Sequence, residues 1–169
     1  MKLRGLLRKR IEEWIKKRTS RGYGRVKIIP GSQTIIEIPS FNRITDVDVK
    51  YQLTQDFAYA HIKWDKERKS LVYELIEPEL NEEEKKILEI IKKDLLEIID
   101  VELSEIKKVE GIMDYIEDNV NRILKDEGIK IKEDSYRKII YYIYRDFVGF
   151  NEIDALFHDP YIELSLIHI

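Results

Sequence analysis

Glycine spacing decides whether this chain of 169 residues could hold a nucleotide. A Walker loop needs Gly-x4-Gly-Lys-Ser/Thr, because closely spaced backbone amides must surround the phosphates while the lysine neutralises them. None of the seven glycines begins this pattern, and Gly22-Tyr23-Gly24 is interpreted as a turn. The chain therefore contains no recognisable nucleotide-binding motif.

Histidines and carboxylates are the other groups that could carry chemistry. None of His61, His158 and His168 has a partner three or four positions away that would make a metal pair on a helix. Asp46-Val-Asp48 lacks the remaining ligands of a calcium loop, and the absence of Cys excludes disulfides and thiolate catalysis. Carboxylate pairs are expected on any charge-rich helical surface. We predict no catalytic, cofactor-binding or metal-binding residue in this chain.

The N-terminal segment, residues 3–18, is the one constellation with functional character. It is predicted to form an amphipathic helix, with apolar residues recurring at helical spacing. Residues 1–27 hold eleven Lys or Arg against two Glu, a charge of +9, whereas the remaining residues hold 19 basic and 31 acidic side chains, a charge of −12. The apolar face carries Leu3, Leu7, Ile11, Trp14 and Ile15.

A basic arm on an acidic body is expected to meet something anionic. The first reading is an anionic membrane surface or a membrane-protein partner, and the alternative is a solvated helix that packs its apolar stripe on its own domain. Nucleic acid is not expected, because the acidic body would repel a long duplex, and four tyrosines at helical spacing are predicted to be core and rim rather than a stacking platform. These tyrosines are Tyr136, Tyr141, Tyr142 and Tyr144. The candidate membrane- or partner-binding residues are Arg8, Lys9, Arg10, Trp14, Lys16, Lys17 and Arg18.

The elements that position this arm are predicted to form an α+β fold that is mainly α. A linker over 19–33 precedes a strand at 34–38, residues 40–55 show no clear period, and residues 57–76 alternate as a hairpin. Three amphipathic helices follow and form a bundle. The first starts after Asn81, with Glu84 completing a capping box. The other two run from Ser104 or Val109 to Lys125, and from about Asp134 to just before Gly149.

Two segments carry a resemblance, residues 73–86 and residues 141–163. In the second, eleven residues match a pattern of Arg-Asp-Phe, Gly, Ile-Asp, Leu and Asp-Pro-x-Ile-Glu, with Ala155 where Pro is usual. The segments resemble the N-terminal region of archaeal type II/type IV secretion-system ATPases, which include archaellum and pilus assembly motors. The matching residues are Arg145, Asp146, Phe147, Gly149, Ile153, Asp154, Leu156, Asp159, Pro160, Ile162 and Glu163.

The resemblance implies a homo-hexameric ATPase that uses ATP and Mg²⁺ and drives subunit assembly or export through a polytopic membrane platform protein. The family's motor motifs would lie beyond this chain, so no catalytic residue is carried over and the chain itself is expected to bind no cofactor. No apolar run approaches the ~18 residues of a membrane span. We expect a cytoplasmic protein, or one lying at the inner face of the cytoplasmic membrane.

The last six residues, Leu164 to Ile169, match a peptide that a common transposase sequencing adapter encodes, and we expect them to be non-native. The chain is then the truncated front end of a longer protein. The alternatives are a free-standing helical adaptor protein and, less favoured, a nucleic-acid-binding protein. The expected divisions are a basic helix and linker over 1–33, a β-element over 34–80, a three-helix bundle over 81–149, the start of an α/β domain over 150–163 and the tail over 164–169.

Overall fold

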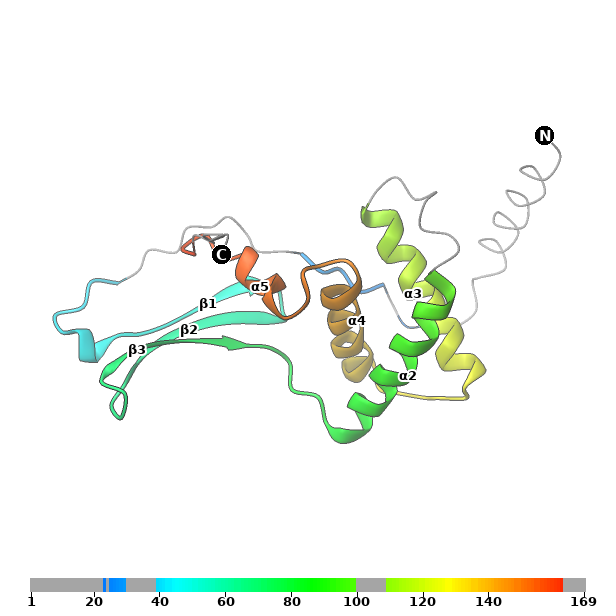
Figure 1. Ribbon diagram of the computed structural model, residues 1–169, viewed down its shortest axis with the longest axis horizontal. Coiled ribbons are helices and arrows are strands. Elements are labelled where there is room, and N and C mark those ends of the chain that lie inside the picture. The colour runs from blue at the N-terminus through cyan, green and yellow to red at the C-terminus, as the bar shows by residue number, and fades with distance from the viewer. Residues whose placement is uncertain (1–22, 24, 30–38, 100–108, 163–169) are drawn as a thin grey trace, which may run out of the picture.

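A computed structural model describes residues 23, 25–29, 39–99 and 109–162 of the chain (Figure 1). A three-stranded sheet lies at one end, and the longer helices lie at the other. This arrangement is α+β, as predicted. The elements are η1 (Ile44–Asp46), β1 (Asp48–Thr54), β2 (Ala58–Asp65), β3 (Ser70–Ile76), α2 (Glu82–Ile99), α3 (Val109–Asp126), α4 (Glu133–Phe147), η3 (Asn151–Ile153) and α5 (Asp154–Phe157).

The sheet is an antiparallel meander in the order β1-β2-β3. The predicted hairpin is confirmed, with Trp64 opposite Leu71 across β2 and β3. The prediction that residues 40–55 show no clear periodicity was wrong for β1. In this strand Val49, Tyr51 and Leu53 are buried and alternate with exposed residues. The alternation is short and stops at a register shift between residues 52 and 54, which hides it from a search for long repeats.

Helix α2 begins as its local sequence predicts. The Asn81 backbone N–H donates to Glu84 Oε2 at 2.9 Å, and the Glu84 N–H donates to Asn81 Oδ1 at 2.8 Å. These two reciprocal bonds satisfy backbone groups that a helix start otherwise leaves unpaired. The capping box is therefore confirmed.

Two hydrophobic clusters form the core. The helical cluster joins α2, α3 and α4, and the sheet cluster joins the strands to Tyr141 of α4 and Ala155 of α5. Tyr136 and Tyr141 are fully buried, while Tyr142 and Tyr144 are half-buried, as the core-and-rim prediction requires. The ring of Tyr141 stacks on Phe57 with 5.0 Å between centroids, so α4 packs directly on the sheet.

Several predicted segments lie outside the described residues: the basic helix 3–18, the strand 34–38 and the tail 164–169. Within the part that the structure describes, no helix is long and apolar enough to cross a membrane.

Candidate functional site

The candidate binding residues Arg8 to Arg18 lie outside the described residues, but the segment that follows them is placed. We call residues 23–29, described except for residue 24, the strap. The Tyr23 ring stacks on Tyr136 at 4.4 Å between centroids. Its hydroxyl donates to the Ile131 carbonyl at 2.7 Å and accepts from the Ile131 N–H at 3.1 Å. The start of the strap is therefore fixed against α4 and the loop before it.

The strap also reaches the sheet. Val26 and Ile28 pack against both hydrophobic clusters, and the Gln55 N–H donates to the Ile29 carbonyl at 3.1 Å. Sequence reasoning assigned residues 19–33 to a linker, because Gly22 and Gly24 end the predicted helix and Pro30-Gly31 marks a turn. Its described part instead bridges the helices and the sheet.

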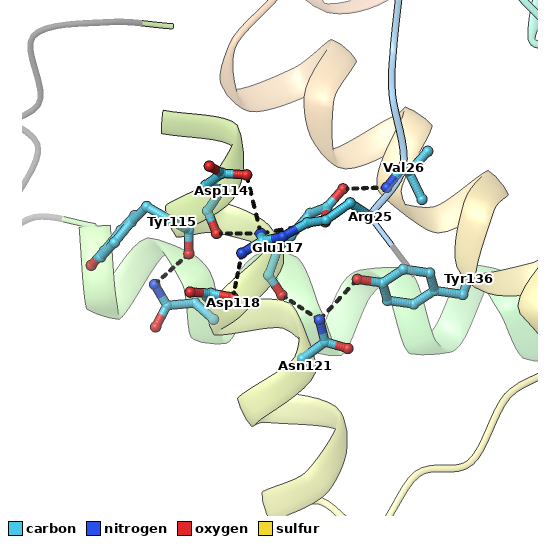
Figure 2. A network of polar contacts seen from close by, with 9 residues as sticks. Arg25, Val26, Asp114, Tyr115, Glu117, Asp118, Asn121 and Tyr136 are labelled. Atoms are coloured by element: carbon cyan, nitrogen blue, oxygen red, sulfur yellow. Dashed lines mark hydrogen bonds and ion pairs between the residues drawn. The ribbon is translucent and has the colours of Figure 1, made fainter. Parts of the chain in front are cut away.

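A cluster of three carboxylates on α3 holds the strap through Arg25 (Figure 2). The guanidinium donates to Asp118 Oδ1 at 3.1 Å and to the Asp114 carbonyl at 3.0 Å. It also lies 3.3 Å from Asp114 Oδ1 and 3.5 Å from Glu117 Oε2. Positions 114, 117 and 118 share one helix face, because residues three and four apart are neighbours on a helix.

Glu117 is the buried member of this cluster, with a side chain only 3% exposed. Its Oε1 accepts the Val26 N–H at 3.0 Å, so one carboxylate contacts both the backbone and the cation of the strap. Burial raises the pKa of Glu117, and the Val26 N–H and Arg25 oppose that rise without cancelling it. Sequence reasoning missed this residue, although an acid beside Ile116 within an apolar stripe was a signal.

Residues 141–163, which carry the family resemblance, form a second polar network at the end of α4. Arg145 donates to Glu77 Oε2 at 3.0 Å and to Asp146 Oδ1 at 2.8 Å, and Lys92 of α2 donates to Asp146 Oδ2. The Tyr141 hydroxyl donates to Glu77 Oε1 at 2.7 Å. Burial acts to raise the pKa of Asp146, but the hydrogen bonds from Arg145 and Lys92 lower it overall. The network ties α4 to α2 and to the end of β3.

Asp154 and Asp159 complete this joint. Asp154 Oδ1 accepts the Phe150 N–H at 3.0 Å, and it lies so close to Gly149 that a Cβ there would be 2.3 Å away. Asp159 Oδ2 accepts from the Tyr51 hydroxyl at 2.7 Å and from the Tyr73 hydroxyl at 2.8 Å. Asp159 therefore holds the segment after α5 on the sheet, whereas Asp154 fixes the turn between α4 and α5.

The polar side chains of these networks hold the helices, the sheet and the strap together. The matched residues Arg145, Asp146, Asp154 and Asp159 all make internal contacts. Among the residues that the structure describes, no three His, Asp or Glu side chains converge as a metal-binding group.

Comparison with known proteins gives a partial relative. No family model matches the chain. An uncharacterized protein of Methanocaldococcus jannaschii is 28% identical over 123 residues, which are 73% of this chain and 48% of that protein. The chain thus spans about half the length of the curated relative that it matches.

Proposed function

We propose that this chain is the N-terminal docking region of a type II/type IV secretion, pilus or archaellum assembly ATPase. The basic arm, residues 3–18, contacts the anionic inner face of the cytoplasmic membrane and the cytoplasmic loops of a polytopic platform protein. The observation that carries the proposal is the strap, which holds the chain directly after this arm against helices and sheet. Because the attachment point is fixed, binding of the arm to a surface also orients the folded body. A flexible tail would not orient it.

The resemblance of residues 141–163 supports the assignment to this class of motor. In the proposal, a three-helix bundle over 81–149 positions the arm, and residues 150–163 lead toward the motor. ATP, Mg²⁺ and a homo-hexamer belong to the intact protein. This chain acts as a non-catalytic docking region.

Vesicle binding tests the docking role. We expect weak, salt-sensitive binding to vesicles that contain phosphatidylglycerol, because basic side chains gain about 1 kcal/mol each near an anionic surface and salt screens that attraction. The variant that combines R8E, K9E, K16E and K17E should not bind. A control with the same charge change on the body, combining K66E, K86E, K125E and K130E, should retain binding through the arm. Equal binding by the arm variant and the unaltered chain would contradict the proposal.

Calorimetry and the coding sequence test the relation to a motor. We expect no saturable micromolar binding of ATP with Mg²⁺ to this chain, and saturable binding would contradict the non-catalytic role. We also expect the genomic reading frame to continue past codon 163 toward a Walker loop roughly one domain further on.

A free-standing adaptor protein is the second candidate. The observation that favours it is that the described residues of 39–99 and 109–162 form two buried hydrophobic clusters. A stop codon directly after Glu163 in the genome would support the adaptor over the motor. A salt-dependent mobility shift with duplex or single strands would instead support the less favoured nucleic-acid role.

A further inference from the structure

The groove between α2 and α3 combines an apolar floor with an acidic rim. Its volume is about 620 Å³, and Ile98 of α2 and Ile123 of α3 lie among its lining residues. Ile90, which is 39% exposed, precedes Asp94 by one helical turn and extends the apolar surface along α2. Ile98 and Ile123 are the apolar members of a lining that is otherwise charged.

The rim carries four carboxylates and one cation. Asp94 and Glu97 belong to α2, Asp126 and Glu127 lie at the end of α3, and Arg122 is the cation. Within the described part of the chain, none of these four carboxylates forms an ion pair with a cationic side chain. This contrasts with the three carboxylates on the strap-facing side of α3, which all form ion pairs with Arg25. The groove therefore offers uncompensated negative charge around apolar side chains.

We infer that this groove is the intramolecular docking site of the basic arm, residues 3–18, which exchanges between its own body and an anionic membrane. The inference rests on the proposed function and adds a way to regulate it: docking in the groove keeps the arm from binding the membrane. The arm is predicted to carry an apolar stripe flanked by Lys and Arg, which matches the floor and rim of the groove in both chemistry and sign. Helices with one apolar face commonly bind in this way.

The strap puts the arm within reach of the groove. Tyr23 stacks on Tyr136, whose hydroxyl accepts from Asn121 Nδ2 at 3.0 Å, and Arg122 of the groove is the next residue along α3. Arg18 precedes Tyr23 by five positions, and an extended chain spans up to about 3.5 Å per residue. The tether thus reaches about 17 Å from a point beside the groove.

Docking on the body lowers the apparent affinity of the arm for lipid, because only the undocked fraction can bind. If the arm is docked about 80% of the time, its release raises the apparent vesicle affinity about fivefold. High salt weakens both contacts, because both depend on exposed charges.

The fluorescence of Trp14 reports the docked state directly. The chain has two tryptophans, so W64F leaves Trp14 as the only one. In this background, without vesicles, the emission maximum of Trp14 should lie at a shorter wavelength than that of a solvent-exposed tryptophan. The groove variant D94K/E97K should shift this maximum to longer wavelength. The same variant should raise the affinity for phosphatidylglycerol vesicles about fivefold. The control E67K/E152K has the same net charge but changes the β2–β3 turn and η3, so it should leave the emission unchanged.

Distance-dependent quenching distinguishes contact between Trp14 and the groove from a change in Trp14 emission that the altered charge alone could cause. The chain lacks cysteine, so R122C can be labelled with bimane at a single site in the groove. Trp14 should quench this label, and W14F should remove the quenching. A label at K66C, on the distant turn, should not be quenched by Trp14.

Unchanged Trp14 emission in D94K/E97K together with no quenching at R122C would overturn the inference. Quenching that appears only as the protein concentration rises would also overturn it, since the groove would then bind the arm of a second copy. A failure of the proposed function would give a different result. Vesicle binding would then not depend on the arm in any variant, while the emission of Trp14 would still report whether the arm binds the groove.

Discussion

At the scale of single residues, two buried acids show how partners set the charge state. Asp146 accepts from two cationic side chains, Arg145 and Lys92, and its pKa is lowered. Glu117 receives one backbone N–H and a longer 3.5 Å contact with Arg25, and its pKa is raised by burial. The same functional group therefore contributes to stability with opposite dependence on pH.

Glu117 should make the protein less stable as the pH rises. Because its pKa in the folded state lies above the unfolded value of about 4.5, the native state binds more protons between the two values, and unfolding free energy falls as the pH increases through that window. Urea unfolding should show that the stability of the unaltered chain relative to E117Q is greatest near pH 4.5 and declines toward neutral pH. A difference that is constant from pH 4.5 to 8 would contradict this.

Asp146 should show the opposite pH dependence of stability and serves as a control. Its pKa is lowered from 3.8, so its contribution is present above about pH 3.8 and is lost as the pH falls through the folded value. The stability of the unaltered chain relative to D146N should therefore decrease on acidification.

Gly149 should tolerate no side chain while Asp154 is present. An added Cβ would lie 2.3 Å from Asp154 Oδ1 and 3.0 Å from the Arg145 carbonyl, and overpacking typically costs about 1–3 kcal/mol. Unfolding measurements on G149A, D154A and the double variant should show that the two losses are not additive, because removal of the Asp154 carboxylate relieves the clash. Additive losses would show that the clash is absent.

At the scale of elements, the strap is the unexpected feature. It has no regular secondary structure, yet it contacts α3, the loop before α4 and the turn after β1. Its stability depends on side chains of α3 rather than on a repeating backbone pattern. An element of this kind can be released without unfolding the rest of the molecule.

Loss of Arg25 should loosen the strap at its far end. R25M keeps the aliphatic stem but leaves Glu117 buried without its cation, which is costly. Hydrogen exchange should then be faster at the Gln55 amide, whose acceptor is the Ile29 carbonyl of the strap. The matched variant K27M, at an exposed strap position, should leave that amide protected. Equal protection in R25M would show that the strap is held without this cluster.

At the scale of the whole molecule, the helices and the sheet meet through a few shared side chains. Tyr141 belongs to α4 but packs in the sheet cluster, and Arg145 links α4 to Glu77 after β3. The strap adds a second connection. These contacts favour one cooperative unfolding unit over two independent ones.

Unfolding should therefore follow a single transition. In W14F the only tryptophan is Trp64 of β2, so its fluorescence reports on the sheet, while circular dichroism at 222 nm reports mainly on the helices. We expect the two urea curves to coincide. In Y141A they should separate, because the ring that stacks on Phe57 and the hydroxyl bonded to Glu77 are both lost. Separate transitions in the unaltered sequence would contradict the cooperative unit.

Local sequence patterns were enough to predict several features of the fold. Alternation gave the β2–β3 hairpin, the Asn81–Glu84 pair gave the start of α2, and helical spacing gave the apolar stripes of α2, α3 and α4. The segregation of charge between the arm and the body is likewise a property of sequence alone. These signals survive in the fold because each depends on residues only a few positions apart.

The contacts between residues far apart in the chain became visible in the three-dimensional structure alone. Val26 and Glu117 are 91 positions apart, and Asp159 is 108 positions from Tyr51 and 86 from Tyr73. It also decided that the strap packs on the body, and it showed that the matched acid Asp159 links the segment after α5 to β1 and β3. The physical reason is that a buried polar group must find a partner wherever packing brings one, and no periodicity in the sequence records that choice.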